Sequence, residues 1–294
     1  MTSYFSQIAD PHSVVTAIDS GVTFPEFLPQ RVNSYQAEIQ LFCQLIQESS
    51  SSAELLERIR TPRAFSADMR MSLLKLFRRC VSTVCDTEAT KKITKTPTYV
   101  FVQNYGHTFK DINVLKFQFA NLQNHEMVAL ASLLGEYDNR GEQGYLLTNS
   151  FFNWVEASYG GAVTIEGPRG AGKDIQLSQV FPNFIGDFPC DFIIRERTTG
   201  RVLAVGFARY DSTRGGSQSD DRTGGNSDKV NKAMQYCYST GNSFKLIFLA
   251  DGPGLVHRDT WEETCRLDGA WDGNVRVTTL RTAPERLDLN WLRS

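Results

Sequence analysis

The chain has 294 residues, a formal net charge of −2 and an apolar content of 41%, which is enough for one large domain or two smaller ones with a sizeable core. A near-neutral total argues against a protein that coats nucleic acid by charge alone. Any nucleic-acid site must therefore be a local concentration of positive charge. The sequence shows no signal-peptide pattern and no apolar run of membrane-spanning length, and we expect no membrane partner. The cysteines form no CxxC pair, so we expect six reduced thiols in a cytoplasmic protein.

Residues 1–140 predict a mostly helical N-terminal region. After a loop-rich lead-in over 1–33, apolar residues recur at helical spacing from Ser34, and a serine run at 49–52 ends this helix and offers an N-cap to the next. A third helix is predicted over 66–85. Its outer face carries basic residues, which form either a solvated surface or a contact with a DNA backbone: Arg70, Lys75, Arg78 and Arg79. The run at 96–106, TPTYVFVQNYG, predicts a strand.

Residues 141–294 alternate between helical and extended patterns. Short β-branched or aromatic runs bounded by turn residues predict the strands, and longer periodic runs predict the helices. The expected order is helix 146–159, strands 162–166, 188–194 and 202–210, helix 226–238 and strand 244–251, then a short helix over 260–267 and a strand over 275–280. This alternation predicts an α/β fold with a central mixed sheet flanked by helices.

The segment Gly167–Asp174, GPRGAGKD, matches a phosphate-binding loop up to its last position. In such a loop glycine amides surround the phosphates, a lysine neutralises them and a final Ser or Thr holds Mg²⁺. Here the final position is Asp174, whose carboxylate would repel phosphate oxygens. A P-loop nucleotide hydrolase is therefore one alternative, and a glycine-rich turn between two strands is the other.

A second pattern places Asp191 at the start of a strand, directly after Pro189 and Cys190. The order helix, three strands, helix, strand, with Pro-x-Asp opening the second strand, resembles the PD-(D/E)XK nucleases over residues 146–251. The glycine- and arginine-rich stretch that follows the third strand resembles a type II restriction endonuclease. The resemblance implies a restriction-endonuclease-like core in which Asp191 binds Mg²⁺ and phosphodiester bonds are hydrolysed.

The chain departs from this family on the third strand. The positions that should read acid-x-Lys, some fifteen residues after Asp191, are Gly206, Phe207 and Ala208; a shift by one residue recovers only a cation, Arg209. Three interpretations stay open. The second acid comes from Glu156, Glu166 or Asp211, with Arg209 near the phosphate; Lys173 takes the lysine's place; or the protein binds DNA without cutting it.

The loop predicted between Arg209 and Asn226 is rich in groups that read bases. Arginine can contact guanine with two hydrogen bonds, Gln and Asn can contact adenine, and acids can orient the arginines. Glycines let the backbone approach phosphates. The candidate DNA-binding residues are Arg209, Asp211, Arg214, Gln218, Arg222 and Asn226; the alternative is a surface loop of mixed charge.

The sequence thus predicts a sequence-specific endonuclease of double-stranded DNA that uses Mg²⁺. The candidate catalytic residues are Asp191, Glu156, Glu166 and Arg209, with Asp191 as the metal ligand. Because a palindromic site is read by a two-fold symmetric protein, we expect a homodimer. A DNA-binding protein without cleavage is the main alternative.

Overall fold

The structure, a computed structural model, describes residues 3–19, 21–136, 138, 141–170, 172–212 and 219–294, with the backbone alone for 219–224. The chain divides into two compact units. The sheet unit comprises Met1–Ser20 and Arg140–Ser294, and the helical unit comprises Gly21–Asn139. The first twenty residues therefore belong with the C-terminal part of the chain and not with the helices that follow them.

The helical unit is built from α-helices around one apolar core. Its elements are α1 (Phe27–Glu48), α2 (Ser52–Arg60), α3 (Ala67–Cys80), α4 (Thr87–Thr90), α5 (Thr98–Tyr105), η3 (Gly106–Thr108), α6 (Ile112–Phe119) and α7 (Asn124–Gly135). Side chains from α1, α2, α3, α5, α6 and α7 meet in the core. The predicted N-cap is confirmed: the hydroxyl of Ser51 accepts a hydrogen bond from the backbone N–H of Glu54.

Two predictions for this unit are corrected. Helix α1 begins at Phe27, not near Ser34, and accommodates Pro29 in its first turn, where a missing N–H has no cost. The strand predicted over 96–106 is helix α5. Its buried residues are Thr98 and Phe101, a helical spacing, so packing overrides the β-propensity of Tyr-Val-Phe-Val.

The sheet unit contains a five-stranded mixed sheet in the order β1-β4-β5-β6-β7. The sheet's first three strands form an antiparallel meander, and the last two run parallel to β5. The strands are β1 (Val163–Glu166), β4 (Phe192–Glu196), β5 (Val202–Tyr210), β6 (Lys245–Asp251) and β7 (Val275–Thr278), with a small antiparallel pair of β2 (Ile175–Gln176) and β3 (Pro189–Cys190) beside it. The predicted α/β class with a mixed central sheet is confirmed.

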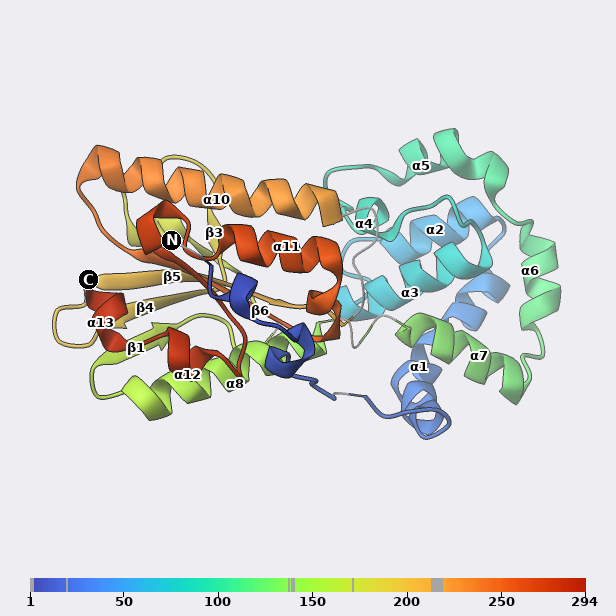
Figure 1. The fold of residues 1–294 in the computed structure, drawn as a ribbon. Helices are drawn as coiled ribbons and strands as arrows, with labels where there is room; N and C mark the ends of the chain where they lie inside the picture. Colours follow the sequence, from blue (N-terminus) through green and yellow to red (C-terminus); the bar gives the residue numbers. More distant parts are fainter. Residues whose placement is uncertain (1–2, 20, 137, 139–140, 171, 213–218) are drawn as a thin grey trace. The chain divides into compact units, whose positions relative to one another are not determined.

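Helices cover both faces of this sheet (Figure 1). One face packs against α8 (Glu142–Tyr159), α12 (Ala283–Arg286) and α13 (Leu289–Arg293). The other packs against α9 (Leu177–Val180), α10 (Ser219–Thr240) and α11 (Arg258–Leu267), and against Phe5 of the N-terminal segment. The remaining short helices are η1 (Phe5–Gln7), η2 (Pro11–Val14), η4 (Pro253–Val256) and η5 (Trp271–Gly273). No helix among the described ranges is long and apolar enough to span a membrane.

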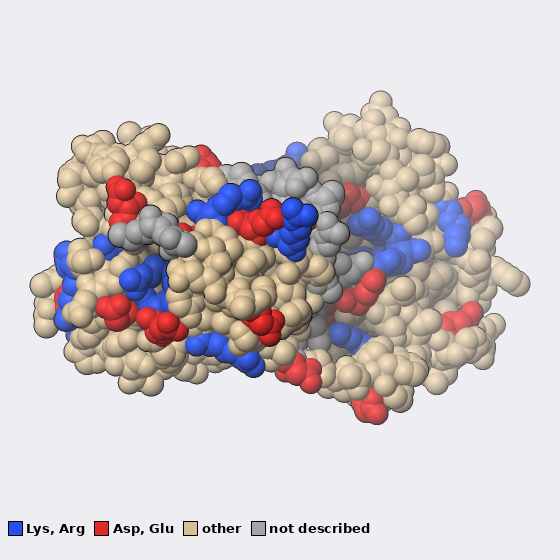
Figure 2. Space-filling view, in the orientation of Figure 1, with Lys and Arg blue, Asp and Glu red and all other residues tan. Residues whose placement is uncertain are grey.

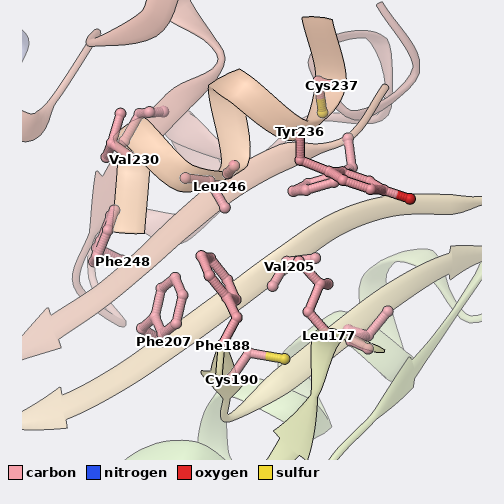
Figure 3. Packing of buried hydrophobic residues seen from close by; sticks show 14 of the residues in the cluster. Leu177, Phe188, Cys190, Val205, Phe207, Val230, Tyr236, Cys237, Leu246 and Phe248 are labelled. Atoms are coloured by element: carbon pink, nitrogen blue, oxygen red, sulfur yellow. The ribbon is translucent and has the colours of Figure 1, made fainter. Parts of the chain in front are cut away.

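Aromatic rings fill the layer between the sheet and α10. Phe207 of β5 stacks on Phe248 of β6 at 5.1 Å between ring centroids and contacts Phe188 at 5.7 Å. Figure 3 shows these rings facing Val230 and Tyr236 of α10. This packing fixes α10 against β5 and β6, and so fixes the polar residues at the margin of the cluster.

Candidate functional site

Asp191 lies in the break between β3 and β4, where its backbone continues the pairing with β5. Its N–H donates to the carbonyl of Gly206 at 2.9 Å, and its carboxylate Oδ2 accepts from the N–H of Ala208 at 2.8 Å. Burial raises the pKa of this carboxyl and the negative charge of Asp174 raises it further, while the Ala208 amide and Lys229 lower it in part. A partly buried acid is thus held at the predicted strand opening.

Lys229 of α10 reaches the same place from the opposite layer. Its Nζ lies 4.0 Å from the centroid of the Phe207 ring. Burial lowers the pKa of this amine, and the charges of Asp191 and Asp174 raise it in part. An acid with a raised pKa and an amine with a lowered pKa therefore share one environment, an arrangement that is enriched in functional sites.

Asp174 is the second carboxylate of this group. It precedes β2 and its side chain is exposed, yet its charge acts on both Asp191 and Lys229. The turn that carries it is anchored to α8 by Arg169, which donates to Asn149 at 2.9 Å and Asn153 at 2.7 Å. The glycine-rich segment 167–174 thus brings an acid, and not a phosphate-binding hydroxyl, to the site.

A pocket of about 640 Å³ opens beside these residues. Its apolar floor comes from β5, β6 and α11, and it is flanked by the polar groups of Asp191, Arg209, Asn226, Lys229 and Glu263. The lining is about equally polar and apolar, and its convergent polar groups are of the kind that orient a bound ligand. Charged groups of both signs can here contact a phosphodiester and its neighbouring atoms.

The register of β5 explains the departure from the acid-x-Lys motif. Gly206 lies opposite Phe192, and a Cβ at Gly206 would lie 2.0 Å from that ring, so this position accepts no acid. Because side chains alternate along a strand, the pocket side of β5 carries Phe207 and Arg209. When the motif is shifted by one residue, its acid position is Phe207, a core phenylalanine with the amine of Lys229 above its ring.

Of the three acids predicted as the second carboxylate, Asp211 lines the pocket, whereas Glu156 and Glu166 do not. Glu156 is exposed on α8 and forms an ion pair with Arg169. Glu166 is exposed at the end of β1 and accepts from Arg195 Nε at 3.0 Å. Exposed pairs of this kind contribute little to stability, and neither carboxylate is among the groups that shift the pKa of Asp191.

Two of the predicted DNA-binding residues lie at the mouth of the pocket as a pair. Asp211 Oδ1 accepts from Arg209 Nε at 2.7 Å and Nη2 at 2.6 Å, so an acid orients this arginine as predicted. Asn226 also lines the pocket, where its Nδ2 donates to Glu263 Oε1 at 2.8 Å.

The predicted recognition loop is shorter than the sequence suggested. Helix α10 begins at Ser219, so Arg222 and Asn226 belong to a helix and not to a loop. The helix start was predicted too late because its first residues are polar and include glycines, which have low helix propensity. Arg214 and Gln218 lie outside the described residues.

The phosphate-loop alternative lacks its expected surroundings. Strand β2 and the four-residue α9 follow Lys173, where a P-loop requires a long helix. The acid that ends β6, Asp251, is fully buried and accepts from the N–H groups of Thr16, Gly252 and Leu280. Lys173 itself is exposed, and the lysine beside Asp191 is Lys229.

The residues present fit a magnesium ion with few protein ligands. Within the described ranges no group of three or more His, Cys, Asp or Glu side chains could hold a metal. Mg²⁺ is commonly held by one or two carboxylates, with waters and substrate phosphates completing its shell. Asp191 supplies a hard oxygen donor in the pocket, since its Oδ1 accepts no hydrogen bond from a described residue. Asp174 is a second carboxylate outside the lining of this pocket, and its charge acts on Asp191.

Asp174 and Lys229 were not predicted as site residues, although the sequence contains evidence for both. Lys229 lies four and seven residues before Ala233 and Tyr236, which are buried, and so shares a helical face with them. This spacing could have predicted a lysine on the inward face of the helix. The replacement of the P-loop hydroxyl by Asp174 was treated only as a defect. The six cysteines are free thiols, as predicted.

Comparisons of the chain with family models, with curated proteins and with solved structures found no match. The fold and the site together define an α/β protein with a mixed sheet and a pocket that Asp191 and Lys229 line, beside which the charge of Asp174 acts on both groups.

Proposed function

We propose that this protein is a Mg²⁺-dependent endonuclease of double-stranded DNA with a PD-(D/E)XK-like core. One observation carries the proposal: Asp191 and Lys229, with oppositely shifted pKa values, share a pocket at the start of the second strand. That strand belongs to the order helix, meander, helix, parallel strand, formed here by α8, β1, β4, β5, α10 and β6.

Each polar group has a part in the proposed reaction. Asp191 and Asp174 would hold a magnesium ion, which when bound polarises a phosphoryl oxygen and lowers the pKa of water. Lys229, because its amine is more easily deprotonated than an exposed lysine, takes a proton from the attacking water. Arg209, oriented by Asp211, donates to non-bridging phosphate oxygens and stays charged throughout.

The test is incubation of the purified protein with plasmid DNA, with and without Mg²⁺. Discrete fragments that require the metal are the expected result, and Asp191→Asn and Asp174→Asn should abolish them. Asp187→Asn is the matched control, because Asp187 is an exposed acid four residues before Asp191. Cleavage by Asp191→Asn at the parent's rate would overturn the assignment.

A second candidate function, DNA binding without cleavage, is favoured by Phe207. Neither alignment of the family's motif supplies an acid on β5, since Gly206 has no side chain and Phe207 is packed in the core, so the reaction depends on Asp174 from a neighbouring loop. Plasmid that is bound and shifted in a gel but stays intact at every Mg²⁺ concentration would select this function.

We further propose that Arg209 and the stretch to Asn226 read bases in the major groove, and that the protein acts as a homodimer on a palindromic site. A bidentate arginine–guanine contact contributes about 1–3 kcal/mol of discrimination. Arg209→Ala should therefore weaken binding to the cleaved sequence more than binding to a scrambled duplex, which loses only the phosphate contact. Equal losses on both duplexes would assign Arg209 to the phosphates, and a monomeric mass on DNA would exclude the dimer.

A further inference from the structure

Positive charge is concentrated in one part of the helical unit. Between Arg58 and Lys95 the chain has ten Lys or Arg residues and three Asp or Glu residues, although the whole chain carries −2. Figure 2 shows basic side chains gathered over the region of α2, α3 and α4. Such local concentration is the property that a near-neutral protein needs in order to bind a polyanion.

Half of these basic side chains have acidic partners. Ion pairs within the unit engage Arg58, Lys75, Arg78, Arg79 and Lys91. In contrast, Arg63, Lys92 and Lys95 are exposed, and none forms an ion pair with a described residue. These three side chains carry positive charge that an anionic ligand can neutralise.

A buried arginine brings these three residues to one end of the unit. Arg60, at the end of α2 and 3% exposed, donates from Nε to the carbonyl of Thr90 at 2.8 Å and from Nη1 to the hydroxyl of Thr98 at 2.8 Å. Its Nη2 donates to the carbonyl of Thr96. Segment 90–98, which carries both lysines, is thereby fixed against the end of α2, three residues before Arg63.

The backbone at Arg63 is the second, independent observation. Its φ of 66° lies in the left-handed region, which costs a residue with a Cβ about 1 kcal/mol and favours glycine. The side chain at this turn is exposed and forms no ion pair with a described residue that would compensate. The arginine is therefore kept for an interaction outside the folded chain.

We propose that Arg63, Lys92 and Lys95, together with the exposed ring of Tyr99, form a surface that binds the phosphate backbone of duplex DNA. Tyr99 is 67% exposed at the start of α5, directly after the fixed segment, and its hydroxyl can donate to a phosphate oxygen. The choice of DNA as the polyanion rests on the proposed function. The surface contributes affinity without sequence preference, because phosphate contacts do not distinguish bases.

The test measures affinity for a mixed-sequence duplex at several salt concentrations, in EDTA so that no cleavage occurs. Each neutralised phosphate contributes about 0.9 to the slope of log K against log salt. The triple variant Arg63→Ala, Lys92→Ala, Lys95→Ala should therefore lose about 2.7 from that slope. The control variant removes three other basic side chains of the same unit, those of Arg58, Lys110 and Lys116. It should change the slope by less than about 0.9, the contribution of one phosphate contact.

A single variant separates binding from folding. Arg63→Gly removes the strained Cβ, so the protein should fold at least as stably and still lose about 0.9 from the slope. Equal slopes for the triple variant, its control and the parent would overturn the surface. Parent protein that sediments with phosphatidylserine vesicles through these residues, and binds no duplex, would replace DNA by lipid headgroups as the ligand.

The two proposals fail separately. If the parent protein cuts plasmid and the triple variant has the same salt slope as the parent, the proposed DNA-binding surface is refuted and the proposed nuclease function is not. If the parent protein never cuts, but its salt slope depends on Arg63, Lys92 and Lys95, the proposed nuclease function is refuted and the proposed DNA-binding surface is not.

Discussion

Asp191, which is partly buried, and Asp251, which is fully buried, lie at strand ends of the same sheet, and they differ in the hydrogen bonds that their oxygens accept. Burial raises the pKa of both carboxyls. Asp251 accepts three backbone N–H groups, from Thr16 and Gly252 on Oδ1 and from Leu280 on Oδ2. Asp191 accepts one, from Ala208, and borders a pocket with Lys229.

The difference separates a structural acid from a candidate functional one. The carboxylate of Asp251 joins the N-terminal segment and the residue after β7 to the end of β6, so its hydrogen bonds offset its burial. Asp191 has fewer hydrogen bonds to offset the same cost and a negative neighbour in Asp174. A buried acid with an oxygen left for a ligand is what a cation site requires.

The largest expected effect is on folding. Asp251→Ala leaves three buried N–H groups without an acceptor, and we expect the free energy of unfolding to fall by roughly 3–5 kcal/mol. Urea denaturation followed by circular dichroism measures the change. A loss below about 1 kcal/mol would remove the distinction between the two acids.

The next effect separates activity from stability at Lys229. Lys229→Met keeps the contact with Phe207 and removes the buried charge, so cleavage should fall by about a hundredfold while the protein becomes no less stable. Lys232→Met is the control, because Lys232 lies on the same helix in an exposed ion pair with Asp228. Equal cleavage by the two variants would exclude the amine from the reaction.

The pH dependence of stability gives opposite signs for the two groups. Since the folded pKa of Asp191 is raised, its ionisation weakens the folded state as pH rises above the unfolded pKa. The advantage of Asp191→Asn over the parent should therefore grow from about pH 4 towards neutrality. The folded pKa of Lys229 is lowered, so the advantage of Lys229→Met should shrink as pH rises towards about 10.5. Urea titrations across this range measure both trends.

The smallest effects are expected at the two acids that the structure leaves outside the pocket. Glu156→Gln and Glu166→Gln each break one exposed ion pair, with Arg169 and Arg195 respectively. Stability should change by less than about 1 kcal/mol, and initial rates of plasmid cleavage should stay close to the parent's. A cleavage defect in either variant as large as that of Asp191→Asn would place that acid in the reaction.

The sequence predicted the sheet unit better than the site. β4, β5 and β6 were readable because short apolar runs between turn residues have few alternatives. The site depends on contacts that local patterns do not contain. Asp174 acts on Asp191 by its charge, although the two lie on different segments of the chain. Only the strand register shows that the ring of Phe192 leaves no room for a side chain at position 206. In the helical unit, packing of Phe101 overrode the strand-like composition of α5.

The most direct test of the account is the unfolding free energy of the parent and of Asp191→Asn at neutral pH, with and without saturating Mg²⁺. Without the metal the variant should be the more stable of the two, since it removes a buried charge. With the metal the parent should gain stability and the variant none, because a ligand stabilises only the state that binds it. A less stable variant, with equal gains from Mg²⁺ in both proteins, would contradict the claim that Asp191 is held for a cation.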